Sequence, residues 1–243
     1  MDGEALIGWY GKLPSLGDFA QRRLPTHFVE TWDDWLARGL ADWRKRDGDA
    51  WLDRYLNGPS WRFVLMPGVL GGDDAAWAGV LMPSVDRVGR YFPLTLAQQL
   101  APPAAMATQL DALLSWLQRL DDLAVDALHD DWSVEQLEQE LRRLGGLQLQ
   151  LDADLRSPEL ALDAPTLELR VPSSLPSMFA GLARAQVQRQ LHGKALWLRS
   201  DVQGELLLRM TTGLPGGGEF VDLLGDACTN IHPPPPEGLK EST

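Results

Sequence analysis

The stretch MPSVDRVGRYFPLTL, residues 82–96, decides how this chain can fold. An apolar run that contains Trp77 leads into it, and a second apolar run begins at Phe92. Such runs, bounded by Gly and Pro, are typical of buried strands. The short turn between them carries three charged residues, Asp86, Arg87 and Arg90. The stretch therefore predicts two strands joined by a charged loop.

The charged residues of this loop have two interpretations. Asp86 can pair with Arg87 or Arg90 and do no more than brace the turn, since ion pairs near a surface contribute little. Alternatively the loop is functional, because a turn does not need two arginines and an aspartate in order to form. The residues alone leave both interpretations open.

Residues 1–100 predict a strand, two helices and three strands, the last of which follows the charged loop. Apolar residues recur with the helical period after Pro25, and Gly48 ends that run. The expected strands are 6–10, 61–66, 77–82 and 92–98, and the expected helices are 26–47 and 49–57. The last three strands can run as an antiparallel meander.

The chain after Pro102 and Pro103 alternates again between helices and strands. Ser133 and Gln136 have the spacing of a capping box, and Gly145 follows as a helix terminator. The expected helices are 104–129, 133–144, 175–190 and 217–225, and the expected strands are 147–151, 167–171, 195–198 and 204–210. This interleaving predicts an α/β fold, a layered α-β-α sandwich with a mixed, largely antiparallel sheet. We expect one domain over residues 1–230 and a Pro-rich tail over 231–243.

Charge and hydropathy exclude several classes of protein. The net charge is −12, and residues 101–170 alone hold 14 acids and five bases. An acidic chain of this kind argues against nucleic acid and anionic membrane surfaces as partners. No apolar run reaches 18 residues, so we expect no membrane insertion, and the acidic N-terminus does not resemble a secretory signal. With a single cysteine, Cys228, these features indicate a cytoplasmic protein without an internal disulfide.

Few residues of the sequence have a type and spacing that predict catalysis or metal binding. The sequence has no G-x-S-x-G elbow and no H-E-x-x-H spacing, so we expect no enzyme, no metal and no cofactor. Lys12 and Asp18, which follow the first strand, are the other charged residues of interest. If their loop meets the loop of Asp86, Arg87 and Arg90, the five make a mixed-charge pocket that suits an anion or a peptide.

Tryptophan is the compositional oddity, with ten residues, seven of them within the first eighty positions. Each ring buries on the order of 150–250 Å². We expect most of them in the core and one or two as anchors of a partner surface.

Two long motifs resemble those of a known family. The segment GWYGKLPSLGDFAQRRLP (8–25), followed by FVETWDDWL (28–36), resembles the N-terminal signature of the type VI secretion-associated TagF family, also called ImpM. The segment 82–96 is similar to the second signature of that family. The pair KALWLRS (194–200) and ELLLRMTTGLP (205–215) resembles its C-terminal part.

The resemblance implies an α/β sandwich without enzymatic activity. It also implies a negative regulator of type VI secretion that acts after translation by binding a forkhead-associated scaffold protein. The family offers no active site to carry over, so Lys12, Asp18, Asp86, Arg87 and Arg90 are candidates for a partner surface or for its support. The alternative is an enzyme or binding protein that acts on an anionic small molecule or phosphopeptide through Lys12, Asp18, Asp86 and Arg90.

Overall fold

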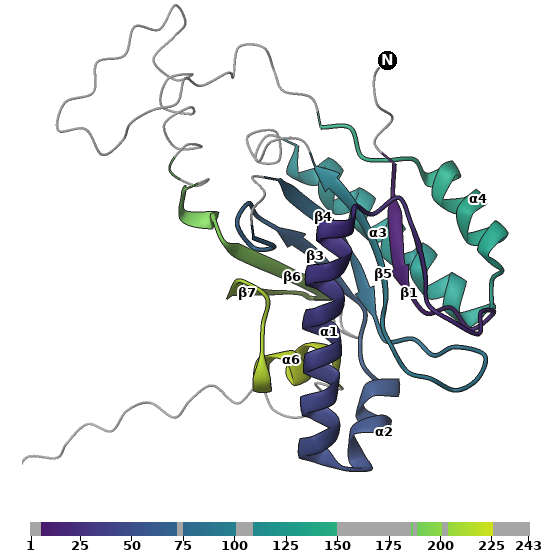
Figure 1. Ribbon diagram of the computed structural model, residues 1–243. Helices are drawn as coiled ribbons and strands as arrows, with labels where there is room; N and C mark the ends of the chain where they lie inside the picture. The colour runs from purple at the N-terminus through teal and green to yellow at the C-terminus, as the bar shows by residue number, and fades with distance from the viewer. Residues whose placement is uncertain are drawn as a thin grey trace, which may run out of the picture.

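A seven-stranded sheet forms the centre of the molecule (Figure 1). The computed structural model describes residues 6–71, 75–100, 109–149, 186, 189–200 and 204–225. The strands are β1 (Gly8–Gly11), β2 (Ala20–Arg22), β3 (Trp61–Leu65), β4 (Ala76–Met82), β5 (Leu94–Leu100), β6 (Lys194–Ser200) and β7 (Leu206–Thr212). Their order is β2-β1-β5-β4-β3-β6-β7, and every pairing between these strands is antiparallel.

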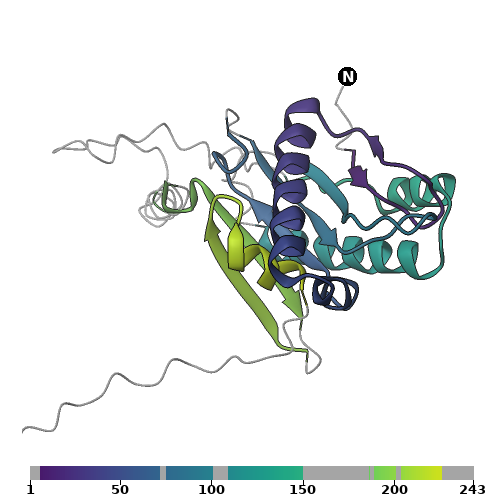
Figure 2. The same cartoon turned by 60° about the horizontal axis from the view of Figure 1, so that its bottom comes forward.

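One face of the sheet is covered by α1 (Thr26–Asp47), with α2 (Ala50–Leu56) and α6 (Gly217–Leu224) beside it (Figures 1 and 2). The core on this face is rich in aromatic residues. Trp32 of α1 lies 5.1 Å from Phe63 and 6.4 Å from Trp197, measured between ring centroids. Buried indole N–H groups need acceptors, and here Trp32 donates to Thr95 Oγ1 at 2.8 Å. Contacts such as that between Trp32 and Trp197 thus join α1 to the sheet.

The other face is covered by α3 (Leu110–His129) and α4 (Val134–Leu144). This core is mostly aliphatic, with leucines of both helices packed against residues such as Val80 and Leu96 of the sheet. Ser133 and Gln136 form the predicted capping box at the start of α4, and Gly145 ends the helix. The two helical layers and the sheet confirm the predicted layered α/β fold.

The antiparallel meander of β3, β4 and β5 and the hairpin of β6 and β7 are also confirmed.

Eight of the ten tryptophans are buried, which confirms the prediction that most lie in the core. The other two, Trp51 and Trp132, are partly exposed. None of the helices in the described ranges is both long and apolar enough to cross a bilayer.

The predicted strand 147–151 is wrong over residues 147–149, the part of it that the structure describes. Residues 147–149 alternate in polarity but form no strand. The Gln98 side chain donates to Leu147 O and accepts from Leu147 N, both at 2.8 Å, so a side-chain amide takes the place of a neighbouring strand. The three-residue β2 was not predicted. The expectations for 104–108, 167–171, 175–185, Cys228 and the 231–243 tail lie outside the described residues.

Candidate functional site

The two charged loops singled out by the sequence meet at one end of the sheet. Because β1 and β5 are antiparallel neighbours, with Tyr10 opposite Thr95, the chain leaving β1 runs beside the chain entering β5. Gly11 makes this approach possible: its φ is +128°, and a Cβ there would lie 2.1 Å from Pro93 O. Lys12 follows directly.

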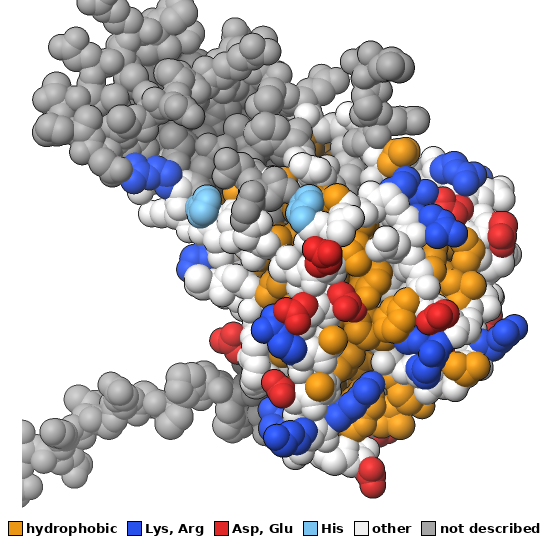
Figure 3. Space-filling model, in the orientation of Figure 1, with side chains coloured by type: hydrophobic (Ala, Val, Ile, Leu, Met, Phe, Trp, Pro, Cys, Tyr) orange, Lys and Arg blue, Asp and Glu red, His pale blue; other side chains and the backbone are white. Residues whose placement is uncertain are grey.

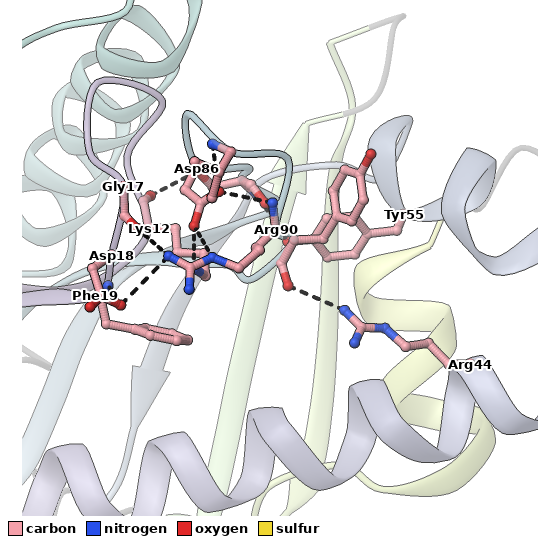
Figure 4. Close-up of polar contacts among 11 residues, drawn as sticks. Lys12, Gly17, Asp18, Phe19, Arg44, Tyr55, Asp86 and Arg90 are labelled. Atoms are coloured by element: carbon pink, nitrogen blue, oxygen red, sulfur yellow. Dashed lines mark hydrogen bonds and ion pairs between the residues drawn. The ribbon is translucent and has the colours of Figure 1, made fainter.

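Lys12 and Asp86 form a buried ion pair. Lys12 Nζ lies 2.5 Å from Asp86 Oδ2, and neither side chain is appreciably exposed (Figure 4). The Asp86 carboxylate also accepts from the backbone N–H of Val88 at 3.0 Å, and from the backbone N–H and Nε of Arg90 at 2.9 and 2.7 Å. A charge buried with this many donors is well compensated.

These contacts lower the pKa of Asp86. Burial alone raises the pKa of the carboxyl, but the hydrogen bonds from Lys12, Arg90 and Val88 outweigh it and hold the pKa well below its usual range. The carboxylate is therefore ionised at neutral pH and organises the loop around itself.

Arg90 links the loop to the segment after β1. Its guanidinium donates to Gly17 O, and Nη2 lies 3.7 Å from Asp18 Oδ1. The backbone N–H of Arg87 donates to Leu16 O at 2.9 Å, while the Arg87 side chain is exposed. Half of the Arg90 side chain and 82% of the Asp18 side chain are exposed, so these residues lie at the surface above the buried pair.

Tyr55 of α2 is hydrogen-bonded to the backbone of Ser84, at the start of the charged loop. Its hydroxyl donates to Ser84 O at 2.9 Å and accepts from Ser84 N at 3.0 Å. Ser84 Oγ in turn donates to Lys12 O at 2.8 Å. Burial raises the pKa of Tyr55, so the phenol stays protonated and able to donate.

A groove of about 740 Å³ opens between α1 and this loop. Figure 3, drawn in the orientation of Figure 1, shows hydrophobic side chains gathered on the face that carries α1, with charged groups at their margins. The lining residues are Lys12, Phe19, Asp33, Ala37, Leu40, Ala41, Arg44, Trp51, Gly89, Arg90, Tyr91 and Phe92. Figure 4 shows Arg44 reaching from α1 toward the loop, where it donates to Tyr91 O at 3.3 Å.

The structure brings together the five residues that the sequence predicted, in two layers. Lys12 and Asp86 are buried, and Asp18, Arg87 and Arg90 are at the surface. Tyr55 and Arg44 were missed, because their helical positions gave no motif, and Phe19 lies within the first signature motif but was not selected as a site residue. In the described part of the chain no group of three or more His, Cys, Asp or Glu is placed to hold a metal ion.

These features define a layered α/β protein with a braced, charged loop beside an open aromatic groove. A family model described as the TagF N-terminal domain, type VI secretion system-associated, matches residues 8–144. The chain belongs to this TagF family, as its two signature motifs predicted.

A solved structure supports the assignment. The crystal structure of PA0076 from Pseudomonas aeruginosa PAO1 is 35% identical, with a TM-score of 0.71, and the match covers 90% of this chain and 93% of that one. A search of curated proteins finds no match.

Proposed function

We propose that this protein is a non-enzymatic negative regulator of type VI secretion that acts after translation by binding a forkhead-associated scaffold protein. Membership of the TagF family supports the link to secretion. The partner and the direction of regulation follow from what the family resemblance implies.

The observation that carries the proposal is the exposed tip of the charged loop. Val88 is a large hydrophobic residue with 63% of its surface exposed, and it follows the exposed Arg87. Asp86 fixes the backbone beneath it through the N–H groups of Val88 and Arg90. A rigid tip that combines an arginine with an apolar side chain suits a protein contact, because little conformational entropy is lost on binding.

The alternative function, an enzyme or binding protein for an anionic small molecule or phosphopeptide, has less support. It requires Lys12, Asp18, Asp86 and Arg90 to converge on a ligand. Lys12 and Asp86 instead neutralise each other out of contact with solvent. The charged groups that remain accessible, Asp18 and Arg90, lie 3.7 Å apart and have opposite sign.

Secretion in a bacterium with an active type VI system tests the proposal. Overproducing the wild-type chain should lower secretion into the medium while transcripts of the secretion genes stay constant. An Arg87→Glu and Val88→Asp double variant should lose this effect. Arg143→Glu, on α4, is the matched control, since its side chain is 81% exposed and lies outside the loop. Repression that persists in the double variant would count against the loop as the contact.

A further inference from the structure

Two arginines of the β6–β7 hairpin converge on one buried aromatic ring. The guanidinium carbon of Arg199 lies 5.2 Å from the centre of the Trp61 ring, and that of Arg209 lies 5.5 Å from it. Trp61 belongs to β3 and is fully buried, while Arg199 lies on β6 and Arg209 on β7. Three neighbouring strands therefore place two positive charges against the same ring.

The register of the hairpin places both arginines on one face of the sheet. Arg199 stands opposite Leu207, and Arg209 stands opposite Trp197. Residues two positions apart on a strand share a face, and Leu207 and Trp197 both pack in the aromatic core between the sheet and α1. The arginines therefore lie on that face, where α6 lies beside the hairpin (Figure 2).

The two charges have no counter-charge. Within the described residues no carboxylate forms an ion pair with Arg199 or Arg209, and Glu205, just before β7, pairs with neither. Arg23, Arg62 and Arg90, by contrast, each lie within 3.9 Å of a carboxylate. The hairpin thus carries positive charge that the described residues do not neutralise.

Arg199 also has a buried donor without an acceptor. Its Nε atom is buried and has no hydrogen-bond partner. A guanidinium stays protonated, so this N–H group always needs an acceptor, and leaving the donor of a charged group unpaired costs stability. The Trp61 ring attracts the cation but supplies no acceptor, because its own N–H group donates to Leu223 O. The missing acceptor must come from outside the described residues.

Charge balance indicates which kind of anion fits. Leu223 lies in the last turn of α6, and the end of a helix carries a negative charge of roughly half a unit. Two guanidinium groups beside it therefore keep an excess of about 1.5 positive charges. A carboxylate supplies one negative charge, whereas a phosphate monoester supplies about 1.5 to 2 at neutral pH and offers three acceptor oxygens.

We infer that Arg199 and Arg209 form a binding site for a phosphate monoester, with the phosphate oxygens accepting from Arg199 Nε and from the Arg209 guanidinium. The planar fork of arginine suits phosphate oxygens, and both side chains are partly exposed, so an anion can reach them. The net charge of −12 opposes an anion only at long range, because salt screens it beyond about 8 Å. The site lies outside the charged loop, so the inference does not depend on the proposed function.

Fluorescence polarisation with a labelled phosphopeptide tests this site. The probe is a rhodamine-labelled Gly-Ser-Gly-phosphothreonine-Gly-Ser peptide, compared with the same peptide carrying threonine or glutamate in place of phosphothreonine. The phosphopeptide should bind at least tenfold more tightly than the threonine peptide, with the glutamate peptide in between. Arg199→Gln and Arg209→Gln should each weaken binding of the phosphopeptide by at least tenfold, the effect of one charge-assisted hydrogen bond.

Arg38→Gln is the matched control, because Arg38 is exposed and pairs with Asp34 on α1. It should bind like the wild type. If Arg199→Gln fails to fold, as judged by circular dichroism, Arg209→Gln on the outer strand decides alone. Equal binding of the phosphopeptide and the threonine peptide by the wild type would overturn the inference, since the arginines would then only cover Trp61. Binding of the glutamate peptide as tight as that of the phosphopeptide would overturn the choice of phosphate.

Competition distinguishes the two sources of such a group. Inorganic phosphate that displaces the peptide at an equal concentration would indicate a site for a free phosphate compound. A requirement for at least a hundredfold excess of inorganic phosphate would indicate a phosphorylated protein segment as the ligand. Either result supports a phosphate site at Arg199 and Arg209, provided that the two arginine variants lose binding.

Discussion

Lys12 Nζ and Asp86 Oδ2 lie 2.5 Å apart although the two residues are 74 positions apart in the chain. The pair joins the segment after β1 to the loop before β5, and both side chains are shielded from water. Removing one partner of a buried pair leaves an uncompensated charge, which is strongly destabilising. The stability of the charged loop therefore depends on this contact.

The first prediction compares how much Asp86 and Lys12 each contribute to the stability of the protein. Asp86→Ala removes the acceptor for Lys12, Arg90 and Val88 together, so it should lower the melting temperature by about 10 °C. Lys12→Met leaves Asp86 with its donors from Arg90 and Val88 and should cost less. Thermal unfolding followed by circular dichroism measures both. Asp18→Ala is the control and should change little, since Asp18 is exposed. Equal losses for all three variants would contradict the structure.

The second prediction is the pH dependence of stability. The lowered pKa of Asp86 means that its contribution is fully present above the ordinary pKa of an aspartate and is lost as the pH falls toward the folded value. The difference in melting temperature between wild type and Asp86→Asn should therefore be constant from pH 8 to about pH 5 and shrink below about pH 4. A difference that grows on acidification would show that the sign is wrong.

The third prediction concerns the brace between α4 and the start of the sheet. Glu138 accepts from Trp9 Nε1 at 2.7 Å and from both terminal nitrogens of Arg23 at 2.6 and 3.0 Å. Burial raises its pKa, but the bonds from Arg23 and Trp9 outweigh this and lower the pKa overall. Glu138→Gln keeps an acceptor for Trp9 and loses the charge, so urea unfolding should show a loss of about 2 kcal/mol. No loss would mean that Arg23 finds another partner.

The fourth prediction compares two glycines of positive φ. Gly11→Ala places a Cβ 2.1 Å from Pro93 O, a backbone atom that cannot move without disturbing the pairing of β1 with β5, and should abolish soluble expression. Gly89→Ala, with φ +81° and open space around it, should cost only about 1 kcal/mol. Soluble yield and unfolding of the two variants measure this contrast. Similar behaviour of the two would contradict the described contact.

Patterns within a segment predicted most of the described fold. The periodicity around Trp32 and Trp35 predicted α1, and Ser133 with Gln136 predicted the start of α4. The meander of β3, β4 and β5 followed from three successive apolar runs bounded by Gly and Pro. These features depend on neighbouring residues, so a single sequence contains enough information to find them.

Features that depend on distant contacts were missed. The polarity of residues 147–149 resembles that of a strand, but the partner of Leu147 is the side chain of Gln98. The charged residues of the site were predicted as a set, since motif positions identified them. Their division into a buried pair and an exposed tip depends on how β1 and β5 align. The same holds for the groove, because Arg44 and Trp51 belong to helices whose packing the sequence does not specify.

Isothermal titration calorimetry with the forkhead-associated scaffold from the same gene cluster tests the central claim most directly. Wild type should bind, the folded Arg87→Glu and Val88→Asp double variant should show binding weakened by at least tenfold, and Arg143→Glu should bind like wild type. Absence of heat for the wild type at high protein concentration would contradict direct binding of the scaffold. Equal binding by the double variant would contradict the assignment of the loop tip as the contact.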